Sequence, residues 1–123
     1  MTENSEDRFS FKIEDGIVHA VFYKEFVDYD YVDAGVKARL ELTGEKSYPM
    51  FSDFRKVKSS TREARERMAA KDAGIGVSAV AILVNSKIQR VIYNFFNSIY
   101  KSPAPARLFT DREKALKWLE QYK

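Results

Sequence analysis

The chain has 123 residues, 45% of them hydrophobic and 32% charged, with a formal net charge of +3. These values are typical of one globular domain, and so mild a charge gives little support to a nucleic-acid partner. The absence of cysteine excludes disulfides, thiolate metal sites and cysteine nucleophiles, and fits a reducing cytoplasm. The polar, acidic start predicts neither a signal peptide nor stable membrane insertion. We expect a flexible tail over residues 1–8 and a single domain over 9–123.

The first half of the chain predicts a hairpin, a helix and a third strand. Apolar and polar residues alternate from Phe9 to Glu14, as in a strand with one face in water. Asp15-Gly16 favours a two-residue turn, and the more apolar returning strand should lie further inside the sheet. In the next segment, carboxylates at positions 28, 30 and 33 suit the start of a helix, and Gly44 suits its end. The predicted elements are strands over 9–14, 17–23 and 48–54 and a helix between Asp28 and Gly44.

The second half predicts alternating helices and strands. The apolar run Val77–Val84 is typical of a strand that is buried on both faces. Ser59, Ser60 or Thr61 can cap the helix before it, and Thr110 or Asp111 can cap the last helix. In chain order we expect a helix over 62–73, a strand over 77–84, a helix over 86–100, a strand over 107–110 and a final helix.

The order β-β-α-β-α-β-α-β-α predicts one α/β domain. A hairpin followed by βα units implies a mostly parallel central sheet that is flanked by helices. Several stretches also share a pattern with one known group of such domains. They are Phe51-Ser52-Asp53-Phe54-Arg55, Ala64-Arg65, Ala79–Val84, the Arg90 to Phe96 helix, and Arg107-Leu108-Phe109-Thr110-Asp111 with Ala115-Leu116-Lys117-Trp118-Leu119.

With the element order, these stretches resemble the SpoIIAA-like superfold of STAS (anti-sigma-factor-antagonist-like) domains. More narrowly, the chain is similar to small stand-alone bacterial STAS/SEC14-like proteins. The resemblance implies a regulatory or protein-interaction module without enzymatic activity. In anti-sigma antagonists, a Ser or Thr at the helix start after the third strand is phosphorylated, and Ser59, Ser60 and Thr61 hold that place. This chain has Lys-Ser-Ser-Thr there, where those proteins have a motif of the Asp-Ser-Ser-Gly type.

The loop after the third strand is the first candidate site, for a protein partner or an anion. Ligands of open α/β sheets bind beyond the carboxyl ends of the strands, and helix starts attract anions. The alternative is structural: Asp53 and Arg55 hold the loop, and a serine only caps the helix. The candidate residues are Asp53, Arg55, Lys58, Ser59, Ser60, Thr61 and Arg62.

The helix over 86–100 is the second candidate, because it is apolar on more than one side. Such a helix is normally covered on both sides. Tyr93, Phe96 and Tyr100 stand outside its sheet-facing stripe. The terminal helix with Trp118 could cover them. Otherwise they predict a homodimer interface or, as the alternative function, a carrier site for a small apolar ligand or lipid beside the helix.

Enzymatic and cofactor sites find little support. His19 is the only histidine and lies in a predicted strand, so we expect a structural role and no metal site. The glycines at 74 and 76 match part of a dinucleotide fingerprint, but they precede the strand that they would have to follow. Nor is there a recognised nucleic-acid motif. We therefore expect no cofactor and no nucleic-acid partner.

Overall fold

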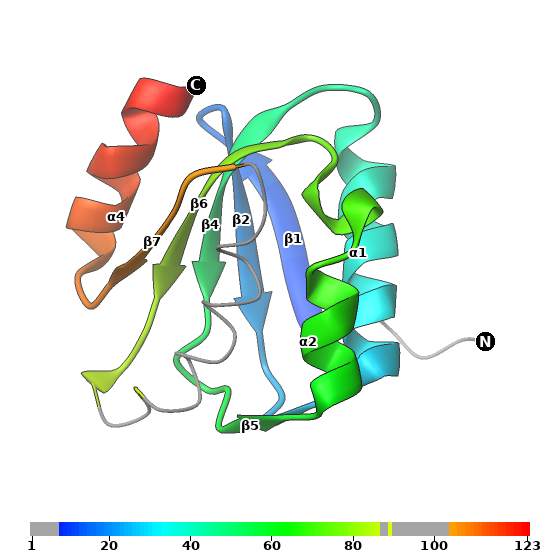
Figure 1. The fold of residues 1–123 in the computed structure, drawn as a ribbon. Coiled ribbons are helices and arrows are strands. Elements are labelled where there is room, and N and C mark those ends of the chain that lie inside the picture. Colours follow the sequence, from blue (N-terminus) through cyan, green and yellow to red (C-terminus); the bar gives the residue numbers. More distant parts are fainter. Residues whose placement is uncertain (1–7, 87–88, 90–103) are drawn as a thin grey trace.

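A five-stranded sheet forms the centre of the computed structural model, which describes residues 8–86, 89 and 104–123 (Figure 1). Its strand order is β1-β2-β4-β6-β7. The strands are β1 (Phe9–Glu14), β2 (Ile17–Phe22), β4 (Tyr48–Asp53), β6 (Val77–Leu83) and β7 (Ala106–Phe109). The mixed α/β class and the mostly parallel sheet are as the sequence predicts.

The hairpin is the one antiparallel part of the described sheet. β1 and β2 pair in a register that sets Phe9 opposite Phe22. Asp15 and Gly16 both have positive φ, at 54° and 75°, which is the geometry of a type I′ turn. The pairs β2–β4, β4–β6 and β6–β7 are all parallel. The prediction that the second strand lies inside the first is therefore confirmed.

Helices cover both faces of the sheet. α1 (Tyr29–Thr43) and α2 (Arg62–Met68) pack against each other on one face, and α4 (Arg112–Leu119) packs on the other (Figure 1). The N-caps of the three helices are the side chains of Asp28, Thr61 and Asp111. Gly44 ends α1 with φ 60°. Short 3₁₀ segments follow α2, over Lys71–Gly74, and α4, over Glu120–Tyr122.

β6 divides the core into two apolar layers, which confirms that this strand is buried on both faces. Val80 and Ile82 face α1 and α2, whereas Ala81 and Leu83 face α4. This alternation is the two-residue period of a strand. An apolar residue at nearly every position is needed because neither face meets water.

A second, two-stranded sheet was not predicted. β3 (Phe26–Val27) pairs in parallel with β5 (Ser59–Ser60) just beyond the carboxyl ends of the main strands. Placing Ser59 and Ser60 in a helix cap was therefore wrong, and Thr61 alone caps α2. Short pairings of this kind depend on tertiary contacts. They are not recognised from the sequence because two residues show too little periodicity.

The second predicted helix is shorter than expected. α2 ends at Met68, and Ala70 adopts an extended conformation with ψ 154°, so the chain turns before the 3₁₀ segment. The turn lets Asp72 pair with Arg67, an interaction that a continuous helix to Ala73 would not favour. Most of the predicted 86–100 helix and of the 1–8 tail lies outside the described residues. Within the described part of the chain, no helix is long and apolar enough to cross a membrane.

Candidate functional site

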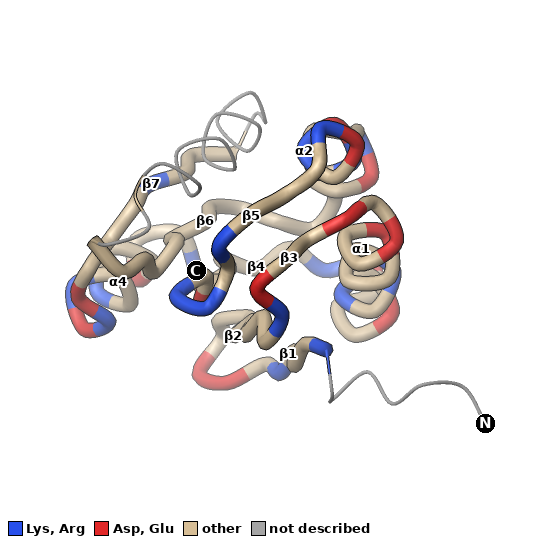
Figure 2. The backbone as a smooth tube through the Cα atoms, turned by 90° about the horizontal axis from the view of Figure 1, so that it is seen from below, with Lys and Arg blue, Asp and Glu red and all other residues tan. Residues whose placement is uncertain are grey.

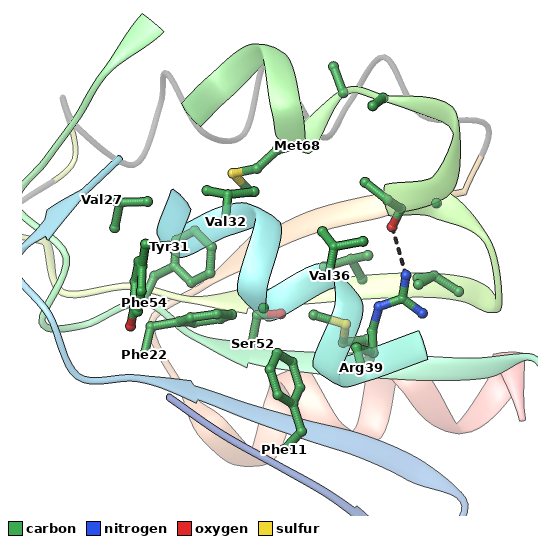
Figure 3. Close-up of a pocket in the computed structure, with 18 of the residues that line it drawn as sticks. Phe11, Phe22, Val27, Tyr31, Val32, Val36, Arg39, Ser52, Phe54 and Met68 are labelled. Atoms are coloured by element: carbon green, nitrogen blue, oxygen red, sulfur yellow. Dashed lines mark hydrogen bonds between the residues drawn. The ribbon is translucent and has the colours of Figure 1, made fainter. Parts of the chain in front are cut away.

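A cavity of about 480 Å³ lies between α1, α2 and the sheet (Figure 3). Its walls come from strands of the central sheet, from α1, from the end of α2 and from the connection between α2 and β6. Most of the lining is apolar. The described lining residues are Phe11, Phe22, Val27, Tyr31, Val32, Gly35, Val36, Arg39, Met50, Ser52, Phe54, Val57, Met68–Lys71, Ala73–Ile75, Val77 and Val80.

Small residues where the helices meet the sheet explain why space remains there. Gly35 lies in the middle of α1, and a Cβ at this position would still be 3.8 Å from Cζ of Phe11. Beyond Met68, the wall consists largely of alanine and glycine, at positions 69, 70, 73 and 74. Larger side chains at these positions would occupy the cavity and give the dense packing that is normal for a protein core. The sequence thus leaves a gap between layers that are otherwise rich in aromatic residues.

Aromatic rings form one end of the cavity. The ring of Phe22 is edge-on to the ring of Phe54, with centroids 5.0 Å apart, and also contacts Tyr31. The Tyr31 hydroxyl donates a hydrogen bond to the backbone carbonyl of Arg8, and burial raises the pKa of this hydroxyl. Because the only polar group of Tyr31 is engaged away from the cavity, this end offers an apolar surface.

Arg39 lies at the opposite end from Phe22 and Phe54 (Figure 3). Its side chain comes from α1 and donates hydrogen bonds to the carbonyl oxygens of Ile75 (2.7 Å) and Ala73 (3.0 Å). Only 3% of the residue is exposed, and burial lowers the pKa of its guanidinium. Ser52 adds a buried hydroxyl to the sheet side of the cavity. The cavity is therefore apolar at one end and cationic at the other.

A network of ion pairs joins the two helices above the cavity. Arg67 of α2 donates to Asp33 of α1 (3.0 Å) and to both carboxylate oxygens of Asp72 (2.7 and 2.9 Å). Lys37 lies 2.9 Å from the other oxygen of Asp33. Hydrogen bonds from these cations hold the pKa values of Asp33 and Asp72 below their ordinary range. Both carboxylates are thus committed to structural partners.

In the predicted loop site, Asp53 and Arg55 are bound to each other. Asp53, at the end of β4, accepts from Nε and Nη2 of Arg55 at 3.0 and 2.8 Å and from its backbone N–H at 3.1 Å. Asp53 is 8% exposed, and the hydrogen bond with its carboxylate raises the pKa of the Arg55 guanidinium. This geometry is what the structural alternative predicts for the pair.

Other residues of the predicted loop site also have partners. Lys58 lies 3.2 Å from Glu25, and Arg62 lies 3.4 Å from Glu66. The Thr61 hydroxyl accepts from the N–H of Ala64, and the Ser60 hydroxyl accepts from Arg65. Figure 2 shows the basic segment that leads into β5 near the segment of mixed charge that leads into β3, so charges of both signs share this end of the molecule. Ser59 is exposed.

Several other predicted features are outside this site. Tyr93, Phe96 and Tyr100 lie outside the described residues, so their assignment stays a prediction. His19 is buried in β2 with its ring edge-on to Phe51, and burial lowers its pKa. Among residues 8–86, 89 and 104–123, no cluster of acidic or histidine side chains could hold a metal ion.

Arg39 and the cavity were missed by the sequence reasoning. The pattern Val32, Val36, Leu40 predicts which side of α1 faces inward, and Arg39 lies next to this stripe. An arginine at such a position is normally expected to reach solvent. Gly35 inside a predicted helix is the feature that could have indicated close packing or a gap.

Solved structures show that the fold is SpoIIAA-like. One is an uncharacterized protein of the DUF3478 family with a SpoIIAA-like fold from Shewanella loihica (TM-score 0.65, 15% identity, 91% of this chain and 94% of the other). Another is an anti-sigma factor antagonist from Mycobacterium paratuberculosis (TM-score 0.63, 15% identity, 93% and 96%). The predicted resemblance to SpoIIAA-like domains is confirmed at the level of fold.

A protein-family model gives a narrower assignment. The chain belongs to the family described as Domain of unknown function (DUF7793), whose model matches residues 11–123. A comparison with curated proteins found no match. The match starts within β1 and ends with the last residue, so it covers the whole central sheet apart from the first two residues of β1, together with the cavity.

Proposed function

We propose that this protein is a non-enzymatic binding module that takes up a small apolar molecule in the cavity between α1, α2 and the sheet. The observation that carries the proposal is the cavity itself. Its volume of about 480 Å³ lies within the range of small-molecule sites, which is roughly 300–1,000 Å³. Its mainly apolar lining with few polar groups is also typical of such sites. This function is of the same class as the carrier alternative, but the cavity lies against α1 and α2, whereas the sequence analysis places the ligand beside the 86–100 helix.

A neutral fluorescent dye, N-phenyl-1-naphthylamine, provides a direct test. The dye should bind saturably with one molecule per chain, with a rise in its fluorescence as it leaves water. Val36→Phe should weaken this binding strongly, because Val36 lines the cavity and the larger ring would occupy it. Leu42→Phe is the matched control, since Leu42 lies on the same helix, is 40% exposed and does not line the cavity. Non-saturable binding, or equal binding by both variants, would contradict the proposal.

A second candidate function is regulatory protein interaction through the surface around β3 and β5. The specific observation is a group of exposed aromatic residues: Phe26 is 53% exposed, Tyr29 46% and Tyr23 39%. They adjoin the predicted loop site, since Phe26 pairs with Ser59 and the ammonium of Lys56 lies 6.0 Å from the Tyr23 ring. Aromatic residues are enriched in protein interfaces, and exposed apolar patches mark interaction sites. The likeness in fold to an anti-sigma factor antagonist supports this candidate.

Mass measurements separate the forms that this second candidate can take. Sedimentation at rising concentration should reveal a dimer if the partner is a second copy. Phe26→Ser should abolish that dimer if β3 forms the interface, and Phe96→Ser should do so if the 86–100 helix forms it. A monomer that persists at high concentration would contradict self-association.

We also propose a cytoplasmic location, because a chain without cysteine fits a reducing compartment.

Phosphorylation or anion binding at the loop is the most specific version of the regulatory candidate. Phosphate on Ser59 would stand in exposed surroundings next to Lys58, and such a group adds nearly two negative charges. Native mass spectrometry of protein purified gently from its own host would reveal it as an adduct mapping to Ser59, Ser60 or Thr61. An unmodified mass under all growth conditions would count against phosphorylation.

A further inference from the structure

Arg39 is the one described arginine of the cavity wall, and its positive charge has no carboxylate partner there. Its two hydrogen bonds go to the backbone carbonyl oxygens of Ala73 and Ile75. A guanidinium has five N–H donors, and the other three have no partner among the described residues. Burying a cation in this way is costly unless an anion compensates it.

Nearby charges do not supply that anion. The carboxylate whose charge acts on Arg39 belongs to Asp72, and both its oxygens already accept hydrogen bonds from Arg67. Lys71 also lines the cavity, but it is exposed and brings no negative charge. Arg67 provides a contrast within the same fold, because it is also buried, at 8% exposed, but pairs with two carboxylates. Arg39 is therefore a buried cation whose charge no anion of the described residues compensates at hydrogen-bond distance.

The rest of the cavity fits the remainder of such a ligand. Phe22, Phe54 and Tyr31 lie at the end away from Arg39, and the hydroxyl of Ser52 lies on the sheet side between them (Figure 3). The Ser52 hydroxyl has no hydrogen-bond partner in the described part of the chain. An apolar body can contact the aromatic rings while a polar end reaches Arg39 and Ser52.

We propose that the ligand is an amphiphile with one carboxylate, such as a fatty acid, and that Arg39 binds its carboxylate while the apolar body lies against Phe22 and Phe54. This inference rests on the proposed uptake of an apolar molecule and specifies its chemical class. The planar guanidinium can donate two parallel hydrogen bonds to a carboxylate. A carboxylate brings one negative charge, which matches one uncompensated cation. A phosphate monoester would bring nearly two.

Calorimetric titration with dodecanoate and dodecanol at neutral pH tests the proposal on the unmodified protein. Both molecules have the same apolar chain, so the difference between them reports the head group. Dodecanoate should bind roughly tenfold more tightly or better, as expected for charge-assisted hydrogen bonds. Dodecyl phosphate should bind more weakly than dodecanoate. Equal affinity for dodecanoate and dodecanol would overturn the role of Arg39 and leave the apolar site intact.

Variants then assign the preference to one side chain. Arg39→Met should remove the preference for dodecanoate while dodecanol still binds, and Arg39→Lys should keep part of it. Arg55→Met is the matched control, since Arg55 is exposed and lies outside the cavity. A preference that survives Arg39→Met would overturn the proposal. If Arg39→Met does not fold, Arg39→Lys and the comparison in the unmodified protein still decide. Failure of both ligands to bind would overturn the proposed function as well.

Discussion

Arg67 and Asp33 connect the two helices above the cavity, with the Nε of Arg67 3.0 Å from a carboxylate oxygen of Asp33. The residues are 34 positions apart in the chain, and Arg67 is 8% exposed. The small residues of the α2–β6 connection leave space below this contact. This ion pair therefore helps to hold α1 and α2 together at the cavity, where apolar packing between them is incomplete.

Removing the Arg67 guanidinium should destabilise the fold. Arg67→Met keeps much of the side-chain volume but leaves the carboxylates of Asp33 and Asp72 without this partner. We expect the free energy of unfolding to fall by about 1–3 kcal/mol, as for buried groups that lose a hydrogen-bond partner. Urea denaturation measures it. Arg62→Met, which removes only the exposed pair with Glu66, should change stability little. Equal losses in both variants would contradict the structural role of Arg67.

Acid should weaken the same network. The pKa values of Asp33 and Asp72 are held below their ordinary value of 3.8, chiefly by hydrogen bonds from Lys37 and Arg67 respectively. A carboxylate with a lowered pKa binds protons more readily when the chain is unfolded, so its contribution is complete above pH 3.8 and is lost as the pH falls through the folded-state pKa. Stability should therefore fall more steeply below pH 4 in the unmodified protein than in Arg67→Met. Urea denaturation at a series of pH values measures the free energy of unfolding of both proteins. An equal pH dependence in the two would contradict the assignment.

The fold could be read from local patterns because those patterns agree with the tertiary structure. Asp15-Gly16 adopts the turn that its residue types favour, and Asp28 and Gly44 bound α1 as predicted. Val77–Val84 lacks a wet face because both faces of β6 are covered. By contrast, the pairing of Phe26–Val27 with Ser59–Ser60 joins segments more than thirty residues apart. Nothing in either short segment specifies the other.

The candidate site could be predicted only in part. The loop at Asp53 was placed correctly at the carboxyl end of a parallel strand, and the hydrogen bonds between Asp53 and Arg55 agree with the structural alternative for this pair. The cavity depends on side chains from five strands and two α-helices, and a void has no sequence pattern of its own. From the sequence, Arg39 looks like a surface residue beside an apolar stripe. It is buried because the Ala73–Ile75 segment passes over it and accepts its hydrogen bonds, and the sequence of α1 does not show this.

Thr61 and Ser59 should respond differently to the loss of their hydroxyl groups. The Thr61 side chain accepts from the N–H of Ala64 at 3.0 Å and caps α2. Thr61→Ala should cost about 1 kcal/mol of stability, the usual effect of losing an N-cap. Ser59→Ala should be nearly neutral, because Ser59 is exposed and its side chain has no partner among the described residues. Thermal denaturation followed by circular dichroism compares the two. Equal effects would mean that the cap is not at Thr61.

Replacement of Gly35 should separate stability from ligand binding. Gly35→Ala should stabilise α1 by about 0.5–1 kcal/mol, since alanine loses less backbone entropy and its Cβ would meet Phe11 at an ordinary 3.8 Å. The same methyl group narrows the cavity, so the affinity for N-phenyl-1-naphthylamine should fall. Gly44→Ala is the contrasting variant: nothing lies within 4 Å of its Cβ, but φ of 60° strains any residue with a side chain, at a cost of about 1–3 kcal/mol. Urea denaturation and dye titration of both variants give the two readouts. Unchanged dye affinity in Gly35→Ala would argue against a ligand that lies beside the middle of α1, whereas a loss of stability would show that the helix has no room there.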